Sequence, residues 1–129
     1  MHKAKKIGKK ISAKLKQIYR EKRPWGDFVR YTKGQLSTVK IIIVKPGEEL
    51  SYQYHNFRDE LWVPLTKGLE FVVDDKVVRP RLFEEFFLPR KTKHRVRGVG
   101  KEKAFWLEIS FGDFDENDVV RLDDKYGRK

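Results

Sequence analysis

Four side chains with metal-binding chemistry stand at spacings that neighbouring strands could bring together. Gln53 and His55 are two residues apart, Glu60 follows five residues later, and His94 begins a later run of β-branched residues. One amide oxygen, two imidazoles and one carboxylate suit Zn, Mn, Fe or Ni and leave positions for water or a substrate. A single histidine in a strand is more often a hydrogen-bonded core group, so the spacing alone leaves both interpretations open.

The elements that must position these residues are predicted to be short strands. From residue 25 onward, β-branched and aromatic residues occur in short runs that Gly, Pro and Asp residues separate. The predicted strands are 27–31, 36–44, 51–55, 60–63, 69–73, 76–78, 82–88, 94–96 and 104–111. Since side chains alternate across a strand, Gln53 and His55 point to one face. Strands of this number and spacing predict an all-β sandwich or small closed barrel.

Composition restricts the class of protein further. A chain of 129 residues with 39% hydrophobic and 13% aromatic residues is long enough for one domain with a packed core. The absence of cysteine excludes disulfides, thiolate metal sites and thiol nucleophiles. The longest apolar runs, such as residues 41–44, are too short to span a bilayer, and no secretory signal is visible. We therefore expect a cytoplasmic protein that does not bind membranes.

The positive charge is concentrated at the N-terminus. Residues 1–24 hold eight Lys, two Arg and one Glu, which gives +9 of the net charge of +11. Ile7, Ile11, Leu15 and Ile18 form an apolar stripe at helical spacing that Pro24 ends, so residues 1–22 are predicted to be a basic helical extension. Such a helix could touch RNA or acidic lipid, but we favour packing on the domain or a partner subunit. The nearly neutral remainder argues against nucleic-acid binding.

Sequence motifs around the four polar residues add a resemblance. Residues 46–55 (PGEELSYQYH) with 58–62 (RDELW) resemble the first cupin motif, and Pro89 with His94 resembles the second. The flanking segments are more specific. RPWG at 23–26 and DVVRLDDKYGR at 118–128 look like the cupin domain of type II mannose-6-phosphate isomerases. In bifunctional members of that family, the cupin follows a mannose-1-phosphate guanylyltransferase.

This resemblance implies a fold, a reaction and a metal. The fold would be a stand-alone cupin, a double-stranded β-helix or jelly-roll barrel, over residues 23–129. The reaction would be the interconversion of mannose 6-phosphate and fructose 6-phosphate. The implied ligands of a divalent metal, usually zinc, are Gln53, His55, Glu60 and His94. No Gly-rich phosphate loop is present, and we do not expect guanylyl transfer.

Several further residues are candidates for the remaining roles. Arg58 and Lys91 lie in loops at the metal end and are the candidates for binding the phosphate, with Arg58 also a catalytic candidate. Glu108 is either the base or a structural carboxylate, and we favour the structural role. Trp62 shares the side of Glu60 and either lines the pocket or belongs to the core. Arg128, in the family-like ending, is a candidate to close over the site.

Strand alternation also assigns residues to the outside of the barrel. If His94 points inward, Arg95 and Arg97 point outward and are expected to be solvated. Tyr52 and Tyr54 also face outward, where cupins often pair, so we expect a homodimer.

Two rival functions remain open. A non-catalytic cupin that binds a sugar or nucleotide sugar, beside a separate guanylyltransferase, is favoured by departures from the family pattern. Asn56 and Phe57 replace histidines, Leu61 replaces another, and Lys91 stands at an expected glycine. An RNA-binding or membrane-associated protein dominated by the basic extension is the third possibility.

Overall fold

The computed structural model describes residues 4–6 and 18–128, and every regular element in them is a β-strand. The strands are β1 (Ala4–Lys6), β2 (Tyr19–Arg23), β3 (Gly26–Arg30), β4 (Ser37–Val44), β5 (Tyr52–Tyr54), β6 (Asp59–Pro64), β7 (Leu69–Val73), β8 (Lys76–Val78), β9 (Glu85–Leu88), β10 (His94–Gly98), β11 (Ala104–Phe111) and β12 (Val120–Asp123). Among the described residues there is consequently no helix of the length and apolarity needed to cross a membrane.

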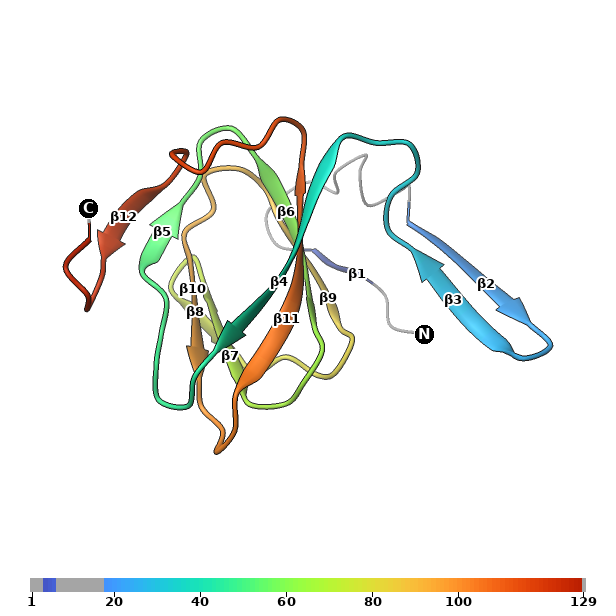
Figure 1. Cartoon of the computed structure of the whole chain (residues 1–129), viewed down its shortest axis with the longest axis horizontal. Helices are drawn as coiled ribbons and strands as arrows, with labels where there is room; N and C mark the ends of the chain where they lie inside the picture. The colour runs from blue at the N-terminus through green and yellow to red at the C-terminus, as the bar shows by residue number, and fades with distance from the viewer. Residues whose placement is uncertain (1–3, 7–17, 129) are drawn as a thin grey trace.

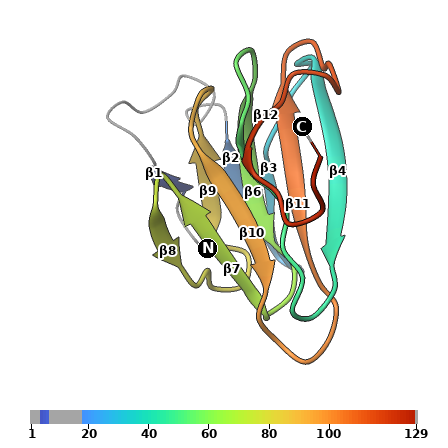
Figure 2. The ribbon, with the colours of Figure 1, turned by 90° about the vertical axis from the view of Figure 1, so that its left-hand side faces the viewer.

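Two five-stranded sheets face each other and enclose the core (Figure 1). Their orders are β1-β9-β6-β11-β4 and β12-β5-β10-β7-β8. Figure 2 places the edge strands β4 and β12 on one side of this pair of sheets, and β1 and β8 on the other. The β2–β3 hairpin is a separate two-stranded sheet that extends away from the barrel (Figure 1). The architecture is the all-β barrel that the sequence predicts.

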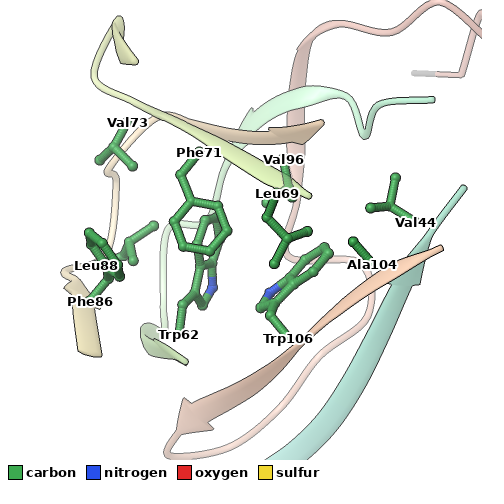
Figure 3. Close-up of a cluster of buried hydrophobic side chains, with 10 residues drawn as sticks. All are labelled: Val44, Trp62, Leu69, Phe71, Val73, Phe86, Leu88, Val96, Ala104 and Trp106. Carbon is green, nitrogen blue, oxygen red and sulfur yellow. The ribbon is translucent and has the colours of Figure 1, made fainter. Parts of the chain in front are cut away.

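The core fills the space between the two sheets (Figure 3). Its centre is aromatic: Trp62 meets the edge of Phe71 at 5.0 Å between ring centroids and lies 6.0 Å from Trp106. Alternate residues of the strands supply the rest of the cluster, which comprises Val44, Leu69, Val73, Phe86, Leu88, Val96 and Ala104. Because this packing fixes β6, β10 and β11 against one another, it also fixes the polar residues these strands carry.

A second apolar cluster covers the outer face of the first sheet. Leu61, Val63, Phe87, Ile109 and Phe111 form it. Ile18 and Tyr31, which flank the β2–β3 hairpin, pack against these residues. On β4, the outward side chains of Val39, Ile41 and Ile43 are each more than half exposed.

The strand predictions from residue 25 onward are confirmed with small shifts of boundary, but the helical prediction for 1–22 is wrong wherever it can be checked. Residues 4–6 pair in parallel with β9, and 19–23 pair with β3 as a hairpin. Residues 1–3 and 7–17 lie outside the described residues. The reason for the error is tertiary: Tyr19 contacts Phe28 and the Arg30 guanidinium across the hairpin, and this pairing overrides the helical spacing of the apolar residues.

Candidate metal centre

Three of the four predicted ligands converge inside the barrel. His55, Glu60 and His94 each offer a ligand atom, and these atoms all lie within 4.8 Å of one another. Nε2 of His55 is 3.5 Å from Oε2 of Glu60, and Nε2 of His94 is 4.0 Å from Oε1 of the same carboxylate. All three side chains are buried. The end of β5, the start of β6 and the start of β10 therefore meet at one carboxylate.

Backbone carbonyls orient both imidazoles. Nδ1 of His55 lies 2.7 Å from the Asp118 carbonyl oxygen, and Nδ1 of His94 lies 2.9 Å from that of Thr92. Since a carbonyl oxygen can only accept a hydrogen bond, each Nδ1 carries the proton and each Nε2 keeps its lone pair. Nitrogen donors with the opposite ring nitrogen fixed in this way are typical of metal-binding histidines.

Gln53 and Glu108 border the same space. Gln53 stands opposite His94 in the β5–β10 pair, and its Oε1 accepts a hydrogen bond from the Ser51 hydroxyl at 2.6 Å. Both residues line a small cavity of about 10 Å³, together with His94 and Trp62. Such a volume has room for about one water molecule. Gln53 thus borders the same cavity as His94, and its role as a fourth ligand stays a prediction.

Arg58 lies inside the centre and not at its rim. Its Nε donates to Oε2 of Glu60 at 3.0 Å, and its Nη2 lies 3.3 Å from Nε2 of His55. The guanidinium also stacks over the Phe114 ring at 4.5 Å and is buried. Arg58 therefore contacts the same lone pairs of His55 and Glu60 that a metal ion would use.

The ionisation of these groups follows from their burial. Burial lowers the pKa of His55, and it lowers the pKa of His94 to about 4. Both imidazoles are thus neutral at pH 7, as metal ligation requires. Burial would raise the pKa of Glu60, but His94, His55 and Arg58 outweigh it and hold that pKa below its ordinary value. Burial and the neighbouring Glu60 raise the pKa of Glu108 to about 8.

The raised pKa of Glu108 links the stability of the metal-free protein to pH. The ordinary pKa of a glutamate is 4.5. Between this pH and about pH 8, the folded protein keeps a proton on Glu108 that the unfolded chain has released. The resulting stabilisation is complete below pH 4.5 and is lost as the pH rises through 8. Glu108→Gln, which stays neutral, is expected to stay within about 1 kcal/mol of the wild type at pH 5 and to exceed its unfolding free energy at pH 9 by roughly 4 kcal/mol. Urea unfolding curves measure this difference, and an equal offset at both pH values would contradict it.

The three remaining site candidates occupy different places. Trp62 is 1% exposed within the aromatic core, and its indole N–H donates to Oε1 of Glu60 at 3.1 Å. Lys91 has an exposed side chain, while its backbone N–H donates to the His55 carbonyl at 2.6 Å. Arg128 donates to the Asp124 carboxylate at 2.9 Å and lines an outer cleft away from the His and Glu group.

Two residues that support the centre were not predicted. The Asp118 carboxylate accepts the backbone N–H groups of Asn56 and Phe57 at 2.8 and 3.0 Å and so fixes the loop after His55. Arg95 is buried, and not solvated as predicted, because it donates to the Leu50 carbonyl and to the Asp123 carboxylate. The contacts of Asp118 with the loop after His55 and of Arg95 with Asp123 both require the C-terminal segment to fold back on β5. No local sequence signal indicates this course of the chain.

The residues present fit a divalent metal ion. Two neutral imidazoles with free Nε2 lone pairs and one carboxylate form a donor set known for catalytic zinc, and the Gln53 amide stands beside them. A metal would replace the Arg58 guanidinium at His55 and Glu60, so these atoms hold one cation or the other.

Two facing sheets with His and Glu donors between them define a cupin, and comparison with solved structures agrees. The chain is similar to CapF, a capsular polysaccharide assembling protein from Staphylococcus aureus (TM-score 0.60, 18% identity, covering 82% of this chain and 34% of CapF). It is also similar to a double-stranded β-helix protein from Klebsiella pneumoniae (TM-score 0.57, 15% identity, 66% of this chain and 73% of that one). Residues 8–124 match the family described as mannose-6-phosphate isomerase C-terminal, and the chain belongs to this family.

The curated relatives include a mannose-1-phosphate guanylyltransferase and an alginate biosynthesis protein. The chain is 35% identical over 129 residues to mannose-1-phosphate guanylyltransferase ManC of Salmonella typhimurium, covering 96% of this chain and 27% of ManC. It is 35% identical over 107 residues to the alginate biosynthesis protein AlgA of Pseudomonas aeruginosa, covering 82% of this chain and 22% of AlgA. The chain thus spans about a quarter of the length of these relatives.

Proposed function

We propose that this chain is a metal-dependent aldose–ketose isomerase that interconverts mannose 6-phosphate and fructose 6-phosphate. The observation that carries the proposal is the buried group of His55, Glu60 and His94, with both Nε2 lone pairs directed at Glu60 and with a second carboxylate, Glu108, beside it. Membership of the mannose-6-phosphate isomerase C-terminal family supports the choice of reaction.

The proposed metal is zinc, held by His55, Glu60, His94 and the amide oxygen of Gln53. When bound, it would polarise the sugar carbonyl and stabilise the negative charge that develops on oxygen. Glu108 borders the same cavity and is the proposed base, because the charge of a bound zinc ion would lower its pKa and ionise it. The carboxylate would remove the proton from C2 of the open-chain aldose and return it to C1, while the O2 proton moves to O1. Arg58, whose guanidinium a bound zinc ion would displace from His55 and Glu60, would then donate hydrogen bonds to the sugar oxygens.

The experiment that tests this function follows the formation of fructose 6-phosphate by zinc-loaded protein from mannose 6-phosphate, with glucose 6-phosphate as the comparison substrate. We expect turnover of mannose 6-phosphate in preference to glucose 6-phosphate. A folded, zinc-bound sample that produces no fructose 6-phosphate would contradict the proposal.

A specific observation favours a second candidate, a non-catalytic cupin that binds a sugar or nucleotide sugar beside a separate guanylyltransferase. Arg58 already contacts the lone pairs of His55 and Glu60 that a metal would use. A permanently bound guanidinium would leave a binding pocket without Lewis-acid chemistry. This candidate predicts that mannose 6-phosphate or GDP-mannose raises the melting temperature of the protein without turnover.

We also propose that the chain forms a homodimer in a cytoplasmic setting. The outward row of Val39, Ile41 and Ile43 on the edge strand β4 supports this, because it is an uncharged, exposed surface on a chain of net charge +11. A second copy could cover these side chains without bringing like charges together. Light scattering should give twice the 15.4 kDa mass of one chain.

A further inference from the structure

We propose that Lys40 and Arg121 bind the phosphate group of the ligand at the open side of the barrel, between the edge strands β4 and β12. The identity of the ligand as a sugar phosphate rests on the proposed function. The assignment of these two cations rests on strand register, burial and the course of the C-terminal segment. Neither residue is among the phosphate candidates that the sequence suggested.

Lys40 stands on the inner face of β4. Its strand neighbours Val39 and Ile41 are exposed on the outside, whereas Ile42 packs against the inner core. In the β4–β11 pair, Lys40 lies directly opposite Glu108, which borders the cavity at the metal centre. The ammonium group therefore lies one strand away from the proposed base, on the same face of the sheet.

Arg121 occupies the corresponding position on the other sheet. It lies opposite Gln53 in the β12–β5 pair, and Gln53 in turn lies opposite His94. Residues directly opposite each other in an antiparallel pair share a face, so Arg121 is on the side of Gln53 and His94. Two strand spacings, roughly 10 Å, separate its backbone from that of His94.

These two strands are edge strands of the two facing sheets. β4 and β12 lie on the same side of the two sheets (Figure 2). A cleft of about 350 Å³ is lined by the end of β4 and by Tyr126 and Arg128, which follow β12. Leu50 lines both this cleft and the inner cavity beside Gln53 and Glu108. The lining of the cleft also includes Lys45, Glu48 and Glu49, whereas Lys40 and Arg121 stand further along the two edge strands, opposite Glu108 and Gln53.

Two cations that the sequence suggested for the site are held by carboxylates. Arg58 is engaged by the buried carboxylate of Glu60, and Arg128 by Asp124. Lys40, in contrast, pairs at 3.3 Å with Glu116, whose side chain is 76% exposed. Such an exposed ion pair contributes little and exchanges readily. A phosphate can therefore take the place of Glu116 at Lys40, and the planar fork of Arg121 suits phosphate oxygens from the opposite side.

Calorimetric titration of the full chain with mannose 6-phosphate and with mannose, as purified and after zinc loading, tests the assignment. We expect the wild type to prefer the phosphorylated sugar. Lys40→Met and Arg121→Met should each weaken binding of mannose 6-phosphate by roughly 10-fold or more and leave mannose binding unchanged. Glu116→Gln, which removes the competing carboxylate, should strengthen it by roughly 2-fold.

Lys76→Met in β8, on the far edge of the second sheet, and Arg79→Met just after that strand are the matched controls. Lys40→Arg and Arg121→Lys keep the charge and should retain most of the affinity, which separates loss of the anion site from loss of folding. Variants that bind like the controls, or a wild type without preference for the phosphate, would overturn the assignment. Phosphate-dependent binding without turnover would contradict only the isomerase function. If the wild type turned over mannose 6-phosphate and neither Lys40→Met nor Arg121→Met changed the Michaelis constant, only the assignment of these two cations to the phosphate would be contradicted.

Discussion

Glu60→Gln is expected to abolish stoichiometric binding of a divalent metal and leave the barrel folded. Glu60 is the carboxylate on which both histidines converge, at 3.5 and 4.0 Å. Replacing its carboxylate by an amide should lower the affinity for zinc by roughly 100-fold or more. Mutating a residue that only hydrogen-bonds to a metal ligand already lowers metal affinity by about 10- to 100-fold. The shape is kept, and the amide oxygen can still accept the Trp62 indole N–H, but the buried Arg58 guanidinium loses its partner charge. The free energy of unfolding should therefore fall by roughly 3 kcal/mol, which leaves the barrel folded.

Equilibrium dialysis with zinc, followed by metal analysis of the protein, measures this effect. Glu70→Gln is the matched control, because Glu70 is also shielded from solvent but pairs with Arg79 and Arg97 away from the centre. The control and the wild type should each bind one zinc per chain. If Glu60→Gln also retained one zinc, the metal would lie elsewhere and the assignment of the centre would be wrong.

Trp62→Ala is expected to have the largest effect on stability. The ring is 1% exposed and contacts Phe71, Trp106 and His94. Truncating a buried Trp of this kind costs about 3–5 kcal/mol, a large part of the total stability of a small domain. For a chain of this size, the melting temperature should fall by roughly 10–20 °C.

Trp25→Ala is the control for this substitution, because Trp25 is 73% exposed in the turn of the β2–β3 hairpin. Its melting temperature should stay close to that of the wild type. Similar losses for the two variants in a thermal scan would mean that Trp62 is not part of the core. A ligand-lining Trp62 would instead change binding of the sugar without lowering stability.

Local patterns predicted the strands and faces of the centre, whereas the choice of these residues as metal ligands rested on the resemblance to the cupin motifs. Alternation placed Gln53 and His55 on one face, and β-branched runs identified the strands that carry Glu60 and His94. Alternation also placed Glu108 with Trp106 and Ser110, and in the structure the Ser110 hydroxyl lies 3.4 Å from Glu60. These features depend on the period of two along a strand, which the sequence displays directly.

Features that depend on distant segments could not be predicted in this way. Residues 19–23 carry a helical spacing, yet they pair with β3 as a hairpin. The burial of Arg95 requires Asp123 of β12, and the positions of Lys40 and Arg121 follow from the order of strands in two sheets. Cross-strand register determines each of these, and single-sequence periodicity carries no information on which strands become neighbours.

The most direct test of the central claim is a zinc titration of the metal-free protein in which bound zinc and the rate of mannose 6-phosphate isomerisation are measured in the same samples. We predict a rate that rises in proportion to bound zinc, reaches its limit at one zinc per chain and is absent in Glu60→Gln. Isomerisation by metal-free protein, or one bound zinc per chain without isomerisation, would contradict the account.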